Sequence, residues 1–175
     1  MNKKDWLALG YDGGTWHHRQ LLVETLKKHL PFKTLLDVGC AHGPDLAIIN
    51  ADMPDVECSG FDITKGDIED GQERLPNSKL WVADIREELP KIPDNSYDVV
   101  LSNGVMMYCE RPLMKELLRI ARKSVVLSER DTGGHMINYL QGELGTDPTI
   151  TKITQDIRDS WKEDGFIYEI KVDNV

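Results

Sequence analysis

An acid and two glycines stand at short spacing in the stretch DVGCAHGPD, which runs from Asp37 to Asp45. The apolar run TLLDV leads into the first glycine, and Pro44 stands where a proline often opens the first turn of a helix. In open α/β sheets the first strand-to-helix turn usually holds the ligand, because ligands sit outside the carboxyl ends of the strands. The stretch therefore predicts a site for a nucleotide-like ligand.

Two common nucleotide sites do not match this stretch. A dinucleotide fingerprint needs G-x-G-x-x-G, but Gly39 and Gly43 bracket Ala41, and Pro44 stands where the last glycine should be. A phosphate-binding loop needs G-K-[ST] before the helix, and the chain has none there. The sequence thus disfavours NAD, ATP and GTP.

Histidine and cysteine side chains form no metal-binding pattern. His17 and His18 are adjacent, so on a helix they point about 100° apart and do not face one ion. Cys40 and His42 lie two residues apart in the glycine loop, without further ligands nearby. We therefore expect no bound metal, and no Ser-His-Asp or Cys-His signature predicts a nucleophilic enzyme.

Strand-like and helix-like segments alternate along the chain. Strands are expected at residues 34–38, 56–62, 79–84, 97–102, 123–129 and 166–172. Helices are expected at residues 15–30, 44–51, 64–75, 111–122 and 149–165. The strands are unbroken apolar runs, which is typical of parallel strands covered on both faces. The pattern predicts a three-layer α/β fold, a Rossmann-like sheet of six or seven mostly parallel strands with helices on both faces.

Length and charge narrow the class of protein. The chain has 175 residues, 40% of them hydrophobic, which suffices for one domain with a real core. Its formal net charge of −9 disfavours bulk nucleic acid, whose binding depends on clustered Lys and Arg. No apolar run approaches membrane-spanning length, and the first residues contain no signal-peptide core.

The three cysteines lack C-x-x-C pairing and are expected to be buried free thiols. We expect a cytoplasmic monomer or homodimer that binds neither membranes nor bulk nucleic acid.

Three stretches, in order, resemble the class I S-adenosylmethionine-dependent methyltransferases. Asp37, Gly39 and Gly43 match the first motif of the family, D-x-G-x-G-x-G. SGFDIT is similar to the end of its second strand, and WVADIREELPKIPDNSYDVVLSNGVMMY is similar to its third and fourth strands with the loop between them. The resemblance covers residues 15–165. Ala41 departs from the usual middle glycine, which is adverse only if that residue needs a positive φ.

The resemblance implies S-adenosylmethionine as the cofactor and S-adenosylhomocysteine as its product. Asp62 would meet the ribose hydroxyls, since it follows Gly43 by about 20 residues, the offset at which an acid reaches a ribose. Asp84 would accept from the adenine amine, and Asn103 would contact the methionine portion. The cofactor contacts that we expect are Arg19, Asp37, Gly39, Cys40, Gly43, Asp62, Ile63, Asp84, Ile85 and Asn103.

Four of these residues also have a plain structural interpretation. Asp62 could form a turn or cap the next helix, and Asp84 could cap a helix that begins before REEL. Asn103 could be a turn residue, and Arg19 could be a solvated arginine on a helix face. If Arg19 instead contacts the cofactor, its guanidinium would pair with the methionine carboxylate.

The residues after the fourth expected strand limit the acceptor. Members of the family that methylate nucleobase or glutamine amide nitrogens carry [DN]-P-P-[YF] there, whereas this chain has SNGVMMY. We expect transfer to an oxygen or nitrogen of a small molecule. A non-catalytic S-adenosylmethionine-binding partner or sensor protein is the alternative. Pro44 disfavours a dehydrogenase, and the lack of an acidic polyamine motif disfavours an aminopropyltransferase.

The acceptor is expected between the stretch YDGGTWHHRQ and the loops after the fourth and fifth strands. The residues expected to line and close this space are Tyr11, Trp16, Met106, Tyr108 and the glycine pairs 13–14 and 133–134. A histidine is suited to remove the acceptor proton. His135 is favoured because it follows the fifth strand on a glycine-flanked turn, and His17 and His18 are the other candidates.

The end of the chain departs from the family pattern. The usual sheet has an antiparallel seventh strand between the fifth and the sixth, but only six strand-like segments are evident here. Either the sheet has six strands, or the last segment takes an unusual place, with an edge that pairs two copies or is blunted by Glu169, Lys171 and Asp173. We expect residues 1–175 to form a single domain, with residues 1–30 as an N-terminal helical cap.

Overall fold

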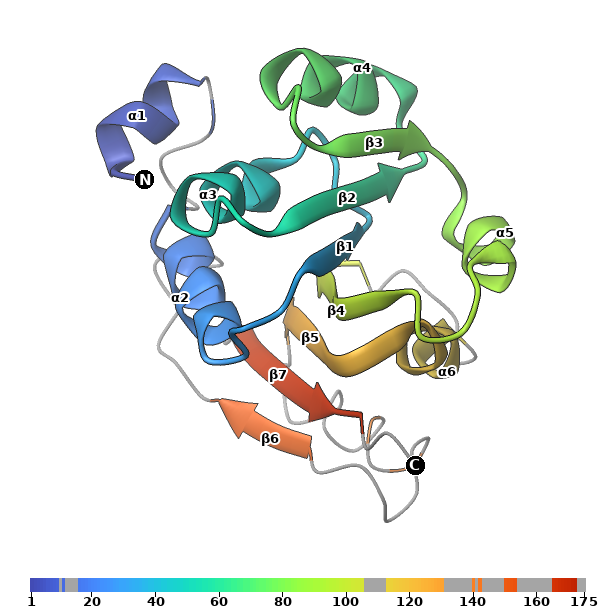
Figure 1. Ribbon diagram of the computed structural model, residues 1–175. Helices are drawn as coiled ribbons and strands as arrows, with labels where there is room; N and C mark the ends of the chain where they lie inside the picture. The colour runs from blue at the N-terminus through green and yellow to red at the C-terminus, as the bar shows by residue number, and fades with distance from the viewer. Residues whose placement is uncertain are drawn as a thin grey trace.

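A seven-stranded sheet in the order β3-β2-β1-β4-β5-β7-β6 forms the centre of the molecule (Figure 1). The computed structural model describes residues 1–9, 11, 16–105, 113–130, 140, 142, 150–153 and 165–172. The strands are β1 (Thr34–Val38), β2 (Glu57–Asp62), β3 (Lys79–Val82), β4 (Tyr97–Asn103), β5 (Ala121–Arg130), β6 (Ile150–Ile153) and β7 (Gly165–Lys171). The strands from β3 to β5 pair in parallel, which confirms the predicted Rossmann-like α/β class.

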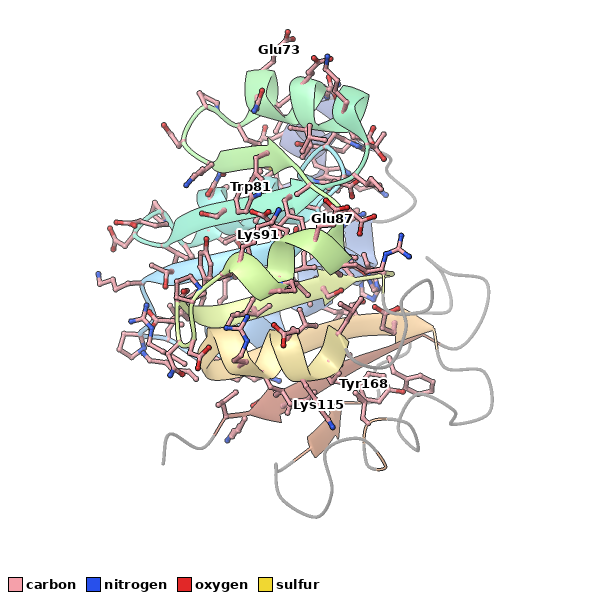
Figure 2. All side chains as sticks on the ribbon, turned by 90° about the vertical axis from the view of Figure 1, so that its right-hand side faces the viewer. Glu73, Trp81, Glu87, Lys91, Lys115 and Tyr168 are labelled. Carbon is pink, nitrogen blue, oxygen red and sulfur yellow. The ribbon has the colours of Figure 1, made fainter. Side chains whose placement is uncertain are left out.

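Helices cover both faces of this sheet (Figure 1). They are α1 (Lys3–Ala8), α2 (Trp16–Lys27), α3 (Pro44–Asp52), α4 (Lys65–Arg74), α5 (Ile85–Glu88), the 3-10 helix η2 (Leu89–Lys91) and α6 (Leu113–Ile120). The alternation of side chains along β1 explains the two layers, because Leu35 packs with residues of α2 and α3 and its neighbour Leu36 packs with residues of η2 and α6. Figure 2 looks onto the second of these faces, where α5 and α6 lie in front of the sheet and Lys115 of α6 reaches the surface.

The predicted helix at residues 149–165 is wrong in its first part, because residues 150–153 form β6. β7 runs antiparallel to both of its neighbours, with Ser124 opposite Lys171 on one side and Ile150 opposite Ile170 on the other. The β-branched residues of ITKI suit a strand, and pairing with β7 outweighs a helical pattern. The segment that the sequence suggested as a sixth strand is therefore the seventh, in the place that the family resemblance implies.

This strand order also corrects the expectation for the sheet edge. Glu169 and Lys171 lie on β7, which is paired on both sides, so they do not blunt an open edge. Asp173 lies outside the described residues. The third strand ends at Val82, earlier than expected, because Asp84 already caps α5.

The helices of the described residues are either too short or too polar to cross a bilayer.

Candidate functional site

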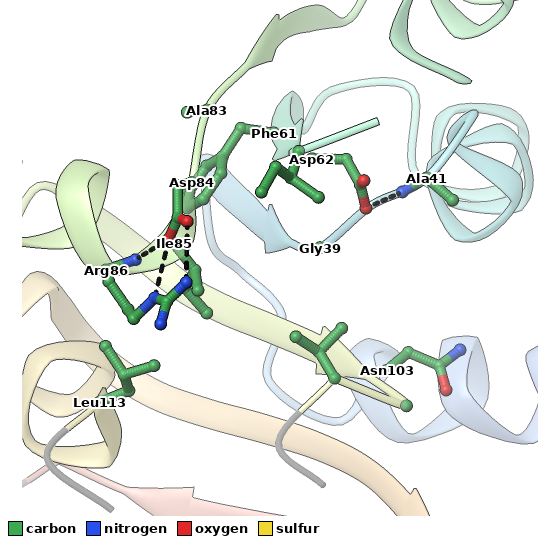
Figure 3. A pocket seen from close by; sticks show the side chains of 13 residues that line it. Gly39, Ala41, Phe61, Asp62, Ala83, Asp84, Ile85, Arg86, Asn103 and Leu113 are labelled. Atoms are coloured by element: carbon green, nitrogen blue, oxygen red, sulfur yellow. Dashed lines mark hydrogen bonds and ion pairs between the residues drawn. The ribbon is translucent and has the colours of Figure 1, made fainter. Parts of the chain in front are cut away.

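A cavity of about 590 Å³ lies at the carboxyl edge of the parallel strands (Figure 3). The segments after β1, β2, β3 and β4 each contribute to its lining, which is the arrangement expected for a ligand site in an open α/β sheet. Six residues predicted as cofactor contacts line it: Gly39, Asp62, Ile63, Asp84, Ile85 and Asn103. Seven further lining residues were not predicted: Ala41, Phe61, Ala83, Arg86, Gly104, Val105 and Leu113.

The loop after β1 depends on glycine at two positions. Gly39 and Gly43 have φ values of 75° and 77°. A Cβ atom at Gly39 would lie 2.4 Å from Cγ2 of Val105, and one at Gly43 would lie 2.5 Å from Cδ1 of Leu75. Ala41 has a positive φ of 47°. An alanine is strained at such a φ, so its replacement of the family's middle glycine is adverse.

Asp62 ties this loop to the second strand. Its Oδ2 accepts a hydrogen bond from the backbone N–H of Ala41 at 3.0 Å, and its Oδ1 accepts from the N–H of Thr64 at 2.8 Å. The turn role considered for Asp62 is therefore real, and the same side chain lines the cavity. Ile63 beside it lines the cavity and is 65% exposed.

Asp84 caps α5 and lines the cavity at once (Figure 3). Its Oδ1 accepts from the N–H of Arg86 at 2.9 Å, and its Oδ2 lies 3.2 Å from Nη2 of the same arginine. These hydrogen bonds from Arg86 lower the pKa of the Asp84 carboxyl. The cap role considered for Asp84 is thus present, but it does not exclude a ligand, since each carboxylate oxygen accepts more than one hydrogen bond.

Asn103 ends β4 at the cavity and joins a buried polar network. Its Nδ2 donates to Oδ2 of Asp45 at 2.9 Å, and its Oδ1 lies 3.1 Å from Nε2 of His18. Arg19 is the ionic partner of Asp45, with Nη1 2.5 Å from Oδ2. Arg19 therefore pairs with a protein carboxylate, and it is not among the residues that line the cavity.

Asp37 lies on β1, fully buried behind the cavity loop. Within the part of the chain that the structure describes, neither of its carboxylate oxygens has a hydrogen-bond partner, and the same holds for Oδ1 of Asp45. Burial first, and then the negative charge of Asp45, raise the pKa of Asp37 well above its usual range, while Arg19 opposes this shift. Two buried acids thus share one arginine.

The two other predicted contacts serve the loop itself. Cys40 is 3% exposed, and burial raises the pKa of its thiol, as it does for Cys58. Gly43 stands at the N-cap of α3 and packs against Leu75. Neither residue is among those that line the cavity. Among the described residues, no cluster of three or more His, Cys, Asp or Glu side chains is arranged to hold a metal.

The residues predicted for the acceptor side are only partly described. His18 is 1% exposed, His17 is exposed on α2, and His135 lies outside the described residues. Tyr11 and Trp16 are buried against Trp6, with ring centroids 4.5 Å and 5.4 Å from it. The remaining predicted residues, Met106, Tyr108 and the glycine pairs 13–14 and 133–134, also lie outside the described residues.

The unpredicted lining residues had weak signals in the sequence. Arg86 follows the predicted Asp84 and Ile85 directly, in the first turn after the third strand, and this adjacency was its signal in the sequence. Val105 lies within the stretch SNGVMMY and Leu113 follows it, but neither residue type by itself points to ligand binding. Their place in the site follows from the folding of the chain around the ends of β1 and β4.

Comparison with known families decides the class of this fold. A family described as "Methyltransferase domain" matches residues 31–163, which is most of the chain and includes every element around the cavity. The chain belongs to the class I S-adenosylmethionine-dependent methyltransferases. The family predicted from the sequence, whose members use S-adenosylmethionine as the methyl donor, is thereby confirmed.

Two curated methyltransferases are similar to this one. Malonyl-[acyl-carrier protein] O-methyltransferase of Methylococcus capsulatus is 32% identical over 111 residues, which cover 59% of this chain and 40% of the relative. Trans-aconitate 2-methyltransferase of Azoarcus sp. is 29% identical over 97 residues, covering 54% and 37% respectively. This methyltransferase therefore spans less than half the length of the curated relatives it matches.

Solved structures share the fold of this methyltransferase at low sequence identity. The plantazolicin methyltransferase BpumL in complex with SAH has a TM-score of 0.74 and 13% identity, over 91% of this chain and 86% of its own. A TehB-like SAM-dependent methyltransferase from Corynebacterium glutamicum has a TM-score of 0.68 and 14% identity, over 85% of each chain. These matches cover 85% or more of this chain and support the fold.

Proposed function

We propose that this methyltransferase binds S-adenosylmethionine in the cavity at the carboxyl edge and transfers its methyl group to an oxygen or nitrogen of a small-molecule acceptor. The observation that carries the proposal is the meeting of four separate segments in one cavity. Gly39, Asp62, Asp84 and Asn103 come from the ends of four consecutive parallel strands, in the order that the family resemblance implies.

The residues around the cavity suit the chemical groups of this cofactor. Asp62 would accept from the ribose hydroxyls, and Asp84 from the adenine amine, with Ile63 and Ile85 packing on the ring. At the Asn103 end, Asp37 and Asp45 have carboxyl oxygens without a hydrogen-bond partner among the described residues, and Arg19 pairs with Asp45. The positive charge of an ammonium or sulfonium group bound nearby would favour the ionised form of Asp37.

Methyl transfer requires little covalent chemistry from the protein itself. The sulfonium of the bound cofactor supplies an activated methyl group with a good leaving group. The chain has to hold the ligand, align the acceptor in line with the transferred carbon and exclude water. Val105, which packs against Gly39, and the loop braced by Asp62 are suited to the holding role.

Removal of the acceptor proton is assigned to a histidine, and His135 stays our first candidate. It follows β5 by five residues in the sequence, and the cavity lies at the carboxyl edge of the parallel strands. His17 is the second candidate, since it is exposed on α2. One of the relatives is an O-methyltransferase, which supports an oxygen acceptor. We further propose a single cytoplasmic domain, monomeric or homodimeric, with residues 1–30 as its cap.

Calorimetry tests the binding half of this proposal. The protein should bind S-adenosylhomocysteine and not NAD, and Asp62→Asn should weaken binding about tenfold, because a charge-assisted hydrogen bond to a buried ligand is lost. Glu57→Gln is the matched control, since Glu57 is exposed at the opposite end of the same strand. Unchanged affinity in Asp62→Asn would contradict the proposed site.

A second experiment separates an enzyme from a silent binder. The protein is incubated with isotopically labelled S-adenosylmethionine and a metabolite extract, and mass spectrometry follows labelled products and S-adenosylhomocysteine. A labelled small molecule formed in step with S-adenosylhomocysteine identifies the acceptor. Binding without any product, across extracts and pH values, would favour a non-catalytic partner or sensor.

A further inference from the structure

Five polar side chains form a continuous buried chain behind the cavity wall. They are Arg19 and His18 of α2, Asp45 of α3, Asn103 of β4 and Ser128 of β5. Only Asn103 of the five lines the cavity, at the end of β4 (Figure 3). The other four are buried or nearly so, since Arg19 is the most exposed of them and its side chain is 17% exposed.

The charges at one end of this chain set the direction of every hydrogen bond in it. Asp45 is paired with Arg19 and only accepts hydrogen bonds, so the Asn103 atom that faces it at 2.9 Å must be the amide nitrogen. The amide oxygen of Asn103 then faces Nε2 of His18 at 3.1 Å and accepts from it. His18 must therefore carry its proton on Nε2.

Ser128 holds the same ring nitrogen from the other side. Its Oγ lies 2.8 Å from Nε2 of His18, so the N–H is shared between the serine hydroxyl and the amide oxygen of Asn103. His18 is thereby fixed between β4 and β5, and it fixes Asn103 in turn. A base that takes a proton from an acceptor would need this nitrogen unprotonated and exposed, and it is neither.

We propose that His18 is a positioning residue, which holds the Asn103 amide in the one orientation that receives the methionine end of the cofactor. The inference rests on the proposed function, because it assigns Asn103 to that part of the ligand. The remaining N–H of the Asn103 amide and the backbone around it are then presented to the cavity in a fixed direction. His18 acts through Asn103 and does not touch the reacting atoms.

Two substitutions at this position form a matched pair. His18→Gln places an amide N–H where Nε2 of the histidine stood, and it keeps the bond to Asn103. His18→Asn places its amide one bond shorter, near the position of Nδ1, and it loses that bond. Both variants remove the titrating ring, so they differ in the hydrogen bond that the proposal invokes.

Calorimetry with two ligands reports where the effect falls. S-adenosylhomocysteine carries the methionine portion, and 5′-methylthioadenosine lacks its amino and carboxyl groups. His18→Asn should raise the Kd for S-adenosylhomocysteine about 3- to 10-fold, the loss expected for one neutral hydrogen bond, and should change the Kd for 5′-methylthioadenosine less than about twofold. His18→Gln should keep both affinities.

Three results would overturn the inference. They are equal weakening of both ligands by His18→Asn, no weakening of either, and a loss in His18→Gln as large as in His18→Asn. Failure of the proposed function itself has a different signature, because the unaltered protein would then bind neither ligand.

If His18→Asn does not fold, long-range ¹H–¹⁵N NMR of the unaltered protein tests the inference instead. The spectrum should show His18 protonated on Nε2, and a proton on Nδ1 alone would overturn the inference.

Discussion

Arg19 and Asp45 form a buried ion pair, with Nη1 of the arginine 2.5 Å from Oδ2 of the aspartate. The same oxygen accepts from Asn103, and the charge of Arg19 also acts on Asp37. Arg19 is thus the cation that balances the acids behind the cavity. The sequence suggested a bond from this arginine to the cofactor, and the structure places a protein carboxylate in its reach.

The first prediction concerns the removal of this cation. Arg19→Ala should lower the free energy of unfolding by about 3–5 kcal/mol, because it leaves Asp45 buried and uncompensated. Asp45→Asn in the same chain should restore a large part of that loss. Urea unfolding of both single variants and the double variant measures the coupling. Additive effects, or a loss below about 1 kcal/mol for Arg19→Ala, would show that the pair does not act as described.

The second prediction separates the two roles of Asp84. Serine caps helices as well as aspartate does, but its side chain is too short to reach a ligand in the cavity. Asp84→Ser should therefore keep the melting temperature and weaken S-adenosylhomocysteine binding about tenfold. Glu87→Gln on the same helix is the control, since Glu87 is exposed and is not among the lining residues. Full affinity in Asp84→Ser would leave this aspartate as a helix cap alone.

The third prediction compares Gly39 and Ala41 of the cavity loop, where exchanging glycine and alanine should have opposite effects on stability. Gly39→Ala should destabilise the protein by about 1–2 kcal/mol through its left-handed backbone, and by more through the contact with Val105. Ala41→Gly should stabilise it by about 0.5–1 kcal/mol, because glycine relieves the positive φ at some cost in chain entropy. Thermal and urea unfolding measure both changes. A stabilising Gly39→Ala would contradict the loop geometry.

The fourth prediction follows from the raised pKa of Asp37. The folded protein holds this carboxyl protonated at pH values where the unfolded chain has lost the proton. The contribution of Asp37 to stability is therefore fully present below about pH 3.8, its pKa in the unfolded chain, and is lost as the pH rises through its pKa in the folded protein. Asp37→Asn does not titrate, and the ligand-free variant should gain melting temperature over the parent as the pH rises. It should also bind S-adenosylhomocysteine more weakly. A difference in melting temperature that is independent of pH would refute this account of the buried acid.

The fifth prediction concerns His29, which lies near Ser124 of β5 and Glu169 of β7. Burial lowers its pKa below 6.5, with Lys171 and Lys28 acting in the same direction and Glu169 opposing. The unfolded chain therefore binds the proton more readily, so this part of the stability is present above about pH 6.5 and is lost as the pH falls through the folded value. His29→Gln should lose less melting temperature than the parent between about pH 7 and about pH 5. His17→Gln, at an exposed histidine, is the control and should follow the parent.

The sequence by itself determined the class of fold, the family and the ends of the strands that build the cavity. Gly39, Asp62 and Asp84 were recognisable because each follows an apolar run at a spacing that only local geometry controls. A strand that is apolar on both faces predicts a parallel, covered sheet without reference to its partners. The ends of the strands and the parallel sheet can be recognised from contiguous residues, and the structure confirms both.

Tertiary structure alone decided what these residues contact. β6 is a strand because β7 pairs with it, although its own segment has a helical pattern. Arg19 binds Asp45, His18 is enclosed by Asn103 and Ser128, and Val105 packs on Gly39, in each case across a large separation in sequence. The partner of a buried charge depends on which elements pack together and how deeply, and the periodicity of a single segment does not encode that information.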